Sequence, residues 1–343
     1  VRSYRRGVLA QLGYVAVAVN EGEYFIPRLN RNQRKQAIEA PSRVGGREMS
    51  NRLVQRLLND ISDDPDQLPI LQHALMRTWE YWGQAGTEGP VDLEHYQATG
   101  GMTEALSRHA DEVFQSLPDG EHRRIATLVF KSLTEKVSEN RGIRRPMQLN
   151  ELHEICGGDI KHLLHVIDEF RKTGCTFLMP AGESALQKHT IIDISHESLM
   201  RVWRTLRLWV DDEAQSAKIY RRLADTASLF KDGKAGLYRH PDLGIALAWR
   251  DENQPNQTWA DRYYPGFAEA MAFLDKSQAE EEREGREKEE AQKRELAQAQ
   301  ALAKAKERTA RIFKAACAGV SLLAVLALYS MIEAQKSRDI ADA

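Results

Sequence analysis

The residue whose type and position point most clearly to chemistry is His196, in the stretch IIDISHESLMRVWRTLRLWV at residues 191–210. It stands where a short apolar strand is predicted to run into a helix. An imidazole N–H can donate a hydrogen bond to a phosphate oxygen, and a helix N-terminus favours anions through its unpaired backbone N–H groups and its dipole. Two interpretations stay open: His196 is a capping or packing residue, or it contacts a phosphate.

The residues around His196 are predicted to hold it at the first turn of one amphipathic helix. Ser195 suits the N-cap because its hydroxyl can accept a hydrogen bond from an unpaired backbone N–H group. Glu197 would lie in the first turn, where the helix dipole favours a carboxylate. The apolar residues that recur at helical spacing form one face: Leu199, Val202, Trp203, Leu206, Trp209 and Val210.

This helix closes a compact run of elements within residues 114–213. Three helices and two strands joined by a hairpin loop are predicted before it: residues 122–135, 147–156, 159–172, 175–181 and 189–195. Three helices followed by a two-stranded wing is the order of a winged-helix domain. Such domains often bind DNA, but the helix that reads the bases needs positive charge near the phosphates. The charged side chains of the third helix sum to zero, so nucleic-acid binding is disfavoured.

The rest of the chain is also predominantly helical. Helical runs are predicted over residues 30–41, 49–61, 63–82 and 95–117, and the first of them is predicted to end at Pro41 because proline is excluded from helix interiors. Residues 1–30 suggest the end of an α/β domain, and residues 214–278 a further helical domain rich in large aromatic side chains.

Composition limits the function classes. A length of 343 residues predicts two or three domains, and a net charge of −2 gives no indication of a nucleic-acid binder. The three cysteines, Cys156, Cys175 and Cys317, are too far apart for a disulfide framework or a zinc site. The chain has no Walker A phosphate loop, no HExxH motif and no CxxC pair, so no complete catalytic site is expected in it. It begins without Met, and we expect it to be part of a longer protein.

A membrane segment is predicted near the C-terminus. Residues 315–332 form an uncharged, mostly apolar run of 18 residues, close to the length of about 20 that spans a bilayer. Arg308, Arg311 and Lys314 precede it, which favours a cytoplasmic N-terminal side. The alternative is a buried core helix. Residues 279–311 consist almost only of Glu, Lys, Arg, Gln and Ala, which indicates a long helix, either solvated or in a coiled coil.

Four stretches carry a resemblance to a known family: PRLNRNQRKQAIEAP, RLVQRLLNDISDDPDQLPILQHALMRTW, GGMTEALSRHADEVF and IDISHESLMRVWRTLRLWVDDEAQSAKIYRRL. Together they resemble the bacterial STAND-type NTPases. The resemblance implies a mainly α chain in which a helical lid and a winged-helix domain follow an NTPase core. The expected domains are a remnant of the P-loop NTPase domain (1–30), the lid (31–113), the winged helix (114–213), a helical domain (214–278), a charged linker (279–311), a transmembrane helix (312–332) and a tail (333–343).

The resemblance also implies three nucleotide-binding residues. Arg2, in VRSY, is similar to the arginine after the sensor-1 strand that can reach the terminal phosphate. Pro69, in QLPILQHAL, is similar to the lid proline that packs on adenine, although Gln67 stands where the family pattern has Gly. His196 is similar to the winged-helix histidine that bonds the β-phosphate of ADP. A proline near a helix start needs no ligand to explain it, so for Pro69 a purely structural role stays open.

The expected function is the regulatory part of a switch that uses ATP or ADP with Mg. The Walker A lysine and Walker B aspartate are expected upstream of Val1, so this chain alone is expected to be inactive. Further expected partners are the bacterial cytoplasmic membrane, crossed once with residues 1–311 in the cytoplasm, a downstream sensor such as a WD-repeat propeller, and a second copy of the chain on activation. The alternatives are a membrane-anchored winged-helix regulator that binds DNA and a structural scaffold.

Overall fold

The computed structural model describes residues 29–61, 67–86, 88–138, 141–182 and 184–341. The fold is mainly helical, as expected: among the described residues, 73% lie in helices and the strands form two small sheets. The chain divides into two compact units. The first holds the described residues through Arg221 together with Asn253–Pro265, and the second holds Arg222–Glu252 and the residues from Gly266 onward. Each unit is described by itself.

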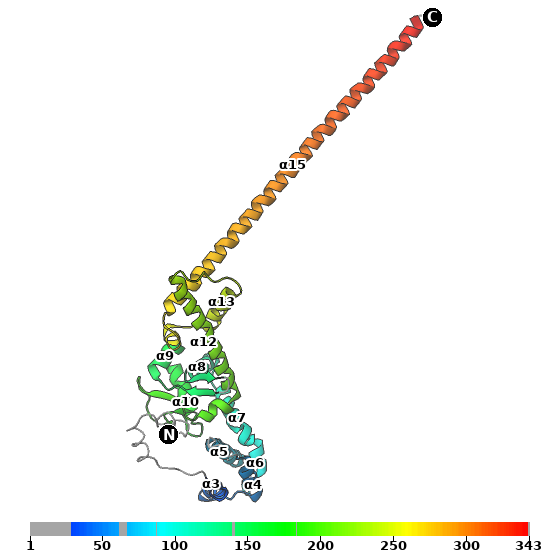
Figure 1. Cartoon of the computed structure of the whole chain (residues 1–343). Coiled ribbons are helices and arrows are strands. Elements are labelled where there is room, and N and C mark those ends of the chain that lie inside the picture. Colours follow the sequence, from blue (N-terminus) through cyan, green and yellow to red (C-terminus); the bar gives the residue numbers. More distant parts are fainter. Residues whose placement is uncertain (1–28, 62–66, 87, 139–140, 183, 342–343) are drawn as a thin grey trace. The chain divides into compact units, whose positions relative to one another are not determined.

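The N-terminal part of the first unit is a bundle of helices (Figure 1). Its helices are α3 (Arg31–Val44), α4 (Asn51–Asp60), α5 (Gln67–Ala85), α6 (Leu93–Ala98) and α7 (Gly101–Gln115). Asn30 and Gln33 form a reciprocal capping box at the start of α3, and Ser50 caps α4. Ile38, Leu53 and Leu57 have no exposed surface and lie at the centre of the core that these helices share.

Two predicted helix boundaries in this bundle were wrong. Helix α3 continues through Pro41 to Val44, although Pro41 has no N–H to donate within the helix. The run predicted as one helix over residues 95–117 is two helices, α6 and α7. Gly100 and Gly101 separate them with φ angles of 90° and 59°, a left-handed conformation that glycine adopts without a steric penalty.

The central part of the first unit contains the predicted three helices and a small sheet. The elements are α8 (Gly120–Ser132), β3 (Met147–Gln148), α9 (Leu149–Cys156), α10 (Ile160–Arg171), β4 (Leu178–Met179) and β5 (Ile191–Ile194). The predicted hairpin is confirmed, since β4 pairs antiparallel with β5 and Leu178 lies opposite Ile194. Strand β3 adds to the other edge of β5, so the sheet has three strands rather than the expected two.

A second hairpin was missed by the sequence analysis. Strands β1 (Thr134–Ser138) and β2 (Arg141–Arg144) pair antiparallel between α8 and α9. The end of the predicted helix 122–135 therefore belongs to a strand. The hydroxyl of Thr134 donates to the carbonyl oxygen of Phe130 at 2.8 Å, which satisfies an acceptor of the last turn of α8 as the chain changes direction.

The helix predicted after His196 is broken in two, α11 (Glu197–Val202) and α12 (Arg204–Lys231). Trp203 lies between them with an extended ψ of 107° and no exposed surface. Its indole N–H donates to Asp111 at 2.6 Å, and its ring packs edge-on against Phe130 at 4.9 Å. The break in the helix therefore coincides with the burial of this one large side chain.

The second unit contains the end of α12, α13 (Asp242–Asn253) and α15 (Phe267–Ala341). The start of α15 packs through Phe273, whose ring lies 5.3 Å from Phe230 and 5.2 Å from Tyr238. The backbone N–H of Tyr238 donates to the hydroxyl of Ser277 at 3.1 Å. The charged linker, the membrane segment and most of the tail predicted from the sequence thus lie in a single helix.

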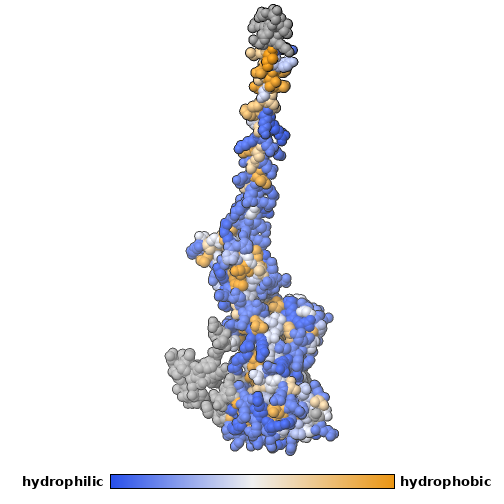
Figure 2. Space-filling view, turned by 90° about the vertical axis from the view of Figure 1, so that its right-hand side faces the viewer, coloured by the Kyte–Doolittle hydropathy of each residue, from blue (hydrophilic) through white to orange (hydrophobic). Residues whose placement is uncertain are grey.

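The distal part of α15 is apolar and exposed. Figure 2 shows hydrophobic residues gathered near its far end and hydrophilic residues before them. The helix includes an 18-residue window with a mean hydropathy of 2.1, so by length and composition it could cross a membrane. No part of this window is buried within the protein. In the charged part, the i, i+4 pairs Glu289–Lys293 and Glu290–Arg294 lie at 2.6 and 3.3 Å, and Glu284 pairs with Arg239.

Candidate functional site

His196, not Ser195, is the N-cap of α11. The ring nitrogen Nδ1 of His196 accepts a hydrogen bond from the backbone N–H of Ser198 at 3.1 Å, and the hydroxyl of Ser198 lies 2.9 Å from the same nitrogen. Ser195 instead extends the strand, and its backbone N–H donates to the carbonyl oxygen of Phe177 at 3.0 Å. Glu197 lies in the first turn, as predicted.

This cap fixes which nitrogen of the neutral imidazole carries the proton. Because Nδ1 of His196 accepts a hydrogen bond, the proton of the neutral ring lies on Nε2, and Nε2 is a donor. The ring is half-buried at the N-terminus of α11. An imidazole N–H of this kind can donate a hydrogen bond to a phosphate oxygen.

The helix that His196 caps lies against the N-terminal helix bundle. Helix α11 contacts α5 and α7, and Val202 at its C-terminal end packs on the core shared by α3–α7. Pro69 is the third residue of α5 and is half-buried. The structure therefore brings together the two helices that carry Pro69 and His196. Arg2 lies outside the described residues.

A chain of three titratable side chains links α5, α7 and the loop that precedes β4. The sequence analysis missed it. Nδ1 of His109, on α7, lies 3.2 Å from Nε2 of His73, on α5, and Nε2 of His109 lies 3.6 Å from the sulfur of Cys175. Phe177 packs against both imidazole rings at 5.5 and 5.2 Å. The only sequence signal was two histidines on apolar helix faces, which is ordinary for core residues.

In the His73–His109–Cys175 chain, a thiol and an imidazole lie together as in a nucleophile and its base. Their pKa values do not suit these roles. Burial raises the pKa of the Cys175 thiol, and burial together with the nearby Arg77 lowers the pKa of His73 to about 4. Burial and Arg77 likewise lower the pKa of His109 to about 3. A thiol that stays protonated is a weak nucleophile. These groups are therefore neutral near pH 7, and the chain is a structural contact.

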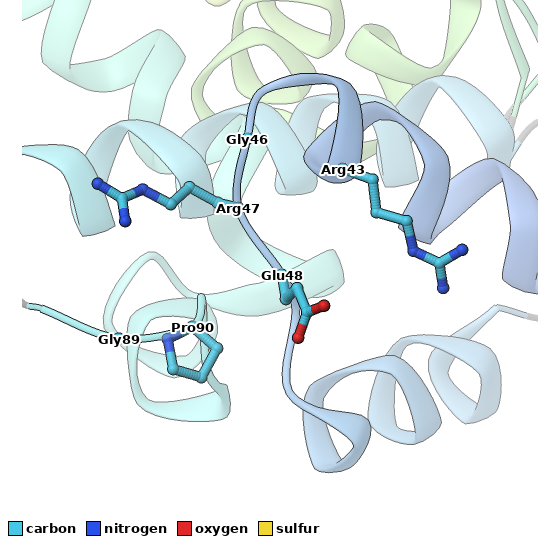
Figure 3. Close-up of a pocket in the computed structure, with 6 residues that line it drawn as sticks. All are labelled: Arg43, Gly46, Arg47, Glu48, Gly89 and Pro90. Carbon is cyan, nitrogen blue, oxygen red and sulfur yellow. The ribbon is translucent and has the colours of Figure 1, made fainter.

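Two hollows lie on the N-terminal bundle. An apolar hollow of about 560 Å³ between α3 and α5 is lined mainly by aliphatic side chains, with Trp79 at one end. A second hollow of about 470 Å³ is lined by Arg43, Arg47 and Glu48 (Figure 3). The two arginines in it point in opposite directions, and Arg43 is paired with Glu39 at 2.9 Å. They do not form a convergent cradle for a phosphate.

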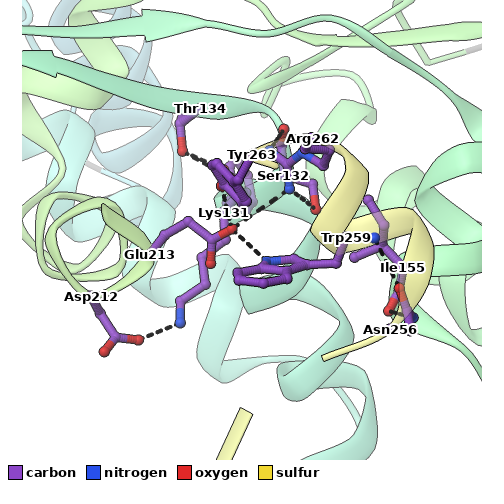
Figure 4. Close-up of polar contacts among 11 residues, drawn as sticks. Lys131, Ser132, Thr134, Ile155, Asp212, Glu213, Asn256, Trp259, Arg262 and Tyr263 are labelled. Carbon is purple, nitrogen blue, oxygen red and sulfur yellow. Dashed lines mark hydrogen bonds and ion pairs between the residues drawn. The ribbon is translucent and has the colours of Figure 1, made fainter. Parts of the chain in front are cut away.

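A buried polar cluster fastens α14 (Gln257–Asp261) and the residues after it within the first unit (Figure 4). One carboxylate oxygen of Glu213 accepts from the indole N–H of Trp259 at 2.8 Å and from the hydroxyl of Tyr263 at 2.6 Å. The Arg262 guanidinium donates to the carbonyl oxygen of Ser132 at 2.8 Å and lies 3.6 Å from Glu213. The side chains are bonded to one another and to the Ser132 carbonyl, although the buried Nε of Arg262 has no hydrogen-bond partner. We therefore interpret the cluster as an anchor.

A search of the described residues finds no group of three or more His, Cys, Asp or Glu side chains arranged to hold a metal ion. Comparison with known proteins adds one result. The model of the family described as Novel STAND NTPase 1 matches residues 1–236, more than two thirds of the chain. The chain belongs to the Novel STAND NTPase 1 family. No curated protein and no solved structure matches it.

The family match covers both described candidate residues, Pro69 and His196, and the buried His73–His109–Cys175 chain. Membership gives this chain a role within STAND NTPases, which use nucleotides. The matched region ends at residue 236 and so excludes α13 and α15. The anchor residues Trp259, Arg262 and Tyr263 also come after residue 236. The segment Asn253–Pro265 of the first unit therefore lies outside the matched region.

Proposed function

We propose that this chain is the regulatory part of an ATP/ADP-dependent STAND signalling switch. The single observation that carries the proposal is the state of His196 in a region that the STAND family model covers. Its Nδ1 is occupied by the cap of α11, which leaves the proton on Nε2, and α11 packs on the helix that carries Pro69. A donor of this kind is suited to bond a nucleotide phosphate.

In the proposed switch, residues 31–113 act as the lid and residues 114–213 as a winged-helix domain. In the ADP state, Pro69 packs on adenine, His196 donates to the β-phosphate, and the core upstream of Val1 supplies the phosphate loop and the Mg site. Arg2 contacts the terminal phosphate of ATP. Exchange of ADP for ATP removes the His196 contact and releases the lid and winged helix. Such a change needs nucleotide contacts that differ between the two states.

The proposed output passes through α15. We propose that its apolar part crosses the bacterial cytoplasmic membrane once, with residues 1–311 in the cytoplasm, and that it connects the switch to a downstream sensor such as a WD-repeat propeller. The exposed apolar window of α15 supports this assignment. Activation would then join copies of the protein into a homo-oligomer.

The charges of α10 argue against DNA recognition as the main function. Arg171 pairs with Asp168 at 2.7 Å and Lys172 pairs with Glu169 at 2.6 Å, so carboxylates of the same helix neutralise the cations at its end. A recognition helix presents such cations to phosphates instead. A pure scaffold would require no nucleotide dependence in the full-length protein.

The test is ADP affinity of the full-length protein with the NTPase core present. His196→Asn keeps an N-cap residue of high preference but removes the imidazole. We expect this variant to lose ADP affinity by about tenfold or more, as for the loss of a hydrogen bond to a charged group. His189→Ala, which removes an exposed histidine of the loop before β5, is the control and leaves the affinity unchanged. If His196→Asn binds ADP as tightly as the wild type, the proposed phosphate contact is wrong.

A further inference from the structure

The charge of α15 reverses just before its apolar part. Residues 296–314 contain five basic side chains, Lys304, Lys306, Arg308, Arg311 and Lys314, and one acidic side chain, Glu307, for a net charge of +4. The basic segment, residues 304–314, ends one residue before the apolar run 315–332 begins. Both stretches lie in the same continuous helix, so their order along the helix axis is fixed.

Four of the five cations of the basic segment form an exposed cationic face, and Lys306 lies on the other side of the helix. Lys304, Arg308, Arg311 and Lys314 follow one another at intervals of four, three and three residues, which puts them on one side of a helix. Among the described residues, the ion pair that the structure gives this segment joins Arg311 to Glu307 at 3.6 Å, with side chains 81% and 69% exposed. Ile312 and Phe313 are 71% and 69% exposed, so apolar side chains also reach outward at the junction.

We propose that the basic segment binds anionic lipid headgroups at the membrane surface. This inference rests on the proposed crossing of the membrane by α15. When residues 315–332 span the bilayer, residues 304–314 lie at the headgroup level of the leaflet where the helix enters, because a helix rises about 1.5 Å per residue. Several exposed cations on one face then meet lipid phosphates. Apart from Glu307, the acidic residues that precede the apolar run lie at or before position 295 of the helix.

The charge pattern also distinguishes this segment from the first charged part of the helix. Residues 280–295 carry eight acidic and five basic side chains. Arg283 there is paired with Glu280 and Glu287, and Arg294 with Glu290. That part is net negative and internally paired, so an anionic surface repels it. Of these two charged stretches, residues 304–314 are therefore the one expected to prefer anionic lipid.

Cys317 gives a direct readout in the full 343-residue chain. It lies three residues after Lys314 and is exposed, whereas Cys156 and Cys175 are 3% and 5% exposed, so a thiol-reactive fluorophore labels Cys317 selectively in the folded protein. The labelled chain is reconstituted into vesicles of phosphatidylcholine and phosphatidylglycerol. Quenching of the fluorophore by brominated phosphatidylglycerol is then compared with quenching by brominated phosphatidylcholine, each at the same mole fraction.

For the wild type at 0.1 M salt, we expect brominated phosphatidylglycerol to quench the fluorophore about threefold or more as strongly as brominated phosphatidylcholine. The reason is that each exposed cation near the membrane surface attracts anionic lipid. The preference falls toward equality at 0.5 M salt, where screening is stronger. A variant with Lys304, Arg308, Arg311 and Lys314 changed to Gln loses the preference. A matched control with Arg283, Lys288, Lys293 and Arg294 changed to Gln keeps it, although its net charge changes equally.

Three outcomes overturn the inference. Equal quenching of the wild type by both lipids at 0.1 M salt overturns lipid binding and leaves the membrane crossing intact. Absence of quenching by either lipid means that Cys317 is not in the bilayer, which contradicts the membrane crossing as well. If a short DNA duplex binds the reconstituted wild type but not the four-Gln variant, and abolishes the lipid preference, the cations serve nucleic acid instead.

Discussion

At the scale of single residues, the observed role of His196 can be separated from its proposed role. It caps α11 through Nδ1, and the proposed nucleotide contact uses Nε2. The cap is a property of the folded chain alone, whereas the phosphate contact needs the nucleotide and the core. Asparagine can take over the first role but not the second, because its short amide is a good N-cap.

We therefore predict different stabilities for two variants of this chain. His196→Ala removes the cap and should lower the free energy of unfolding by about 1 kcal/mol, whereas His196→Asn should change it by no more than a few tenths. Urea unfolding monitored by circular dichroism measures both. Equal losses for the two variants would contradict the prediction that a capping side chain at position 196 stabilises α11.

His73 and His109 predict a dependence of stability on pH. Their pKa values in the folded protein, about 4 and about 3, are below the value of about 6.5 of an unfolded histidine. Their contribution is complete above about pH 6.5 and is lost as the pH falls, because the unfolded chain then binds protons that the folded chain does not. Between pH 6.5 and 4 the free energy of unfolding should fall by up to about 1.4 kcal/mol per pH unit for each histidine.

The control for this slope is a second histidine variant. His109→Gln should reduce the slope by about half, whereas His165→Gln, which changes an exposed ring on α10, should leave it as in the wild type. Chemical denaturation at a series of pH values measures both. A slope that is the same in all three proteins would contradict the assignment to the buried pair.

At the scale of secondary-structure elements, the Glu213 cluster holds α14 in place. Two donors, the indole N–H of Trp259 and the hydroxyl of Tyr263, converge on one carboxylate oxygen. The side chain of Arg262 is 5% exposed, and its guanidinium lies 3.6 Å from the same carboxylate of Glu213. Removing the carboxylate leaves buried donors without a partner, which costs more than the loss of a surface contact.

Glu213→Ala is expected to lower the free energy of unfolding by about 3 kcal/mol or more, the range for breaking a buried charge pair from one side. Glu154→Ala is the matched control, since Glu154 contacts Thr258 of the same α14 at 3.0 Å but is exposed, and it should cost less than about 1 kcal/mol. Urea unfolding gives the magnitudes, and hydrogen exchange of residues 257–261 shows whether α14 detaches. If both variants lose the same stability, Glu213 is not the centre of the anchor.

At the scale of the whole molecule, the chain carries candidate nucleotide contacts but no phosphate loop. The sequence contains no GxxxxGK[ST] motif, and such a loop is what cradles the phosphates in P-loop NTPases. We predict that the purified chain neither hydrolyses ATP nor binds it tightly. Release of inorganic phosphate and isothermal titration with Mg-ATP measure these properties. Turnover that survives removal of contaminating ATPases would refute the prediction.

The amino-acid sequence by itself determined most of the helices, the hairpin of β4 and β5, the apolar part of α15 and the family. These follow from local periodicity and from long motifs, which need no knowledge of distant neighbours. The tertiary structure decided what depends on residues far apart in the chain. The helix breaks at Trp203, which is buried against Phe130 and bonds Asp111, both more than 70 positions away. His109 meets Cys175, and Glu213 meets Trp259, only after folding, because pairing across such distances is set by packing and leaves no periodic trace in the sequence.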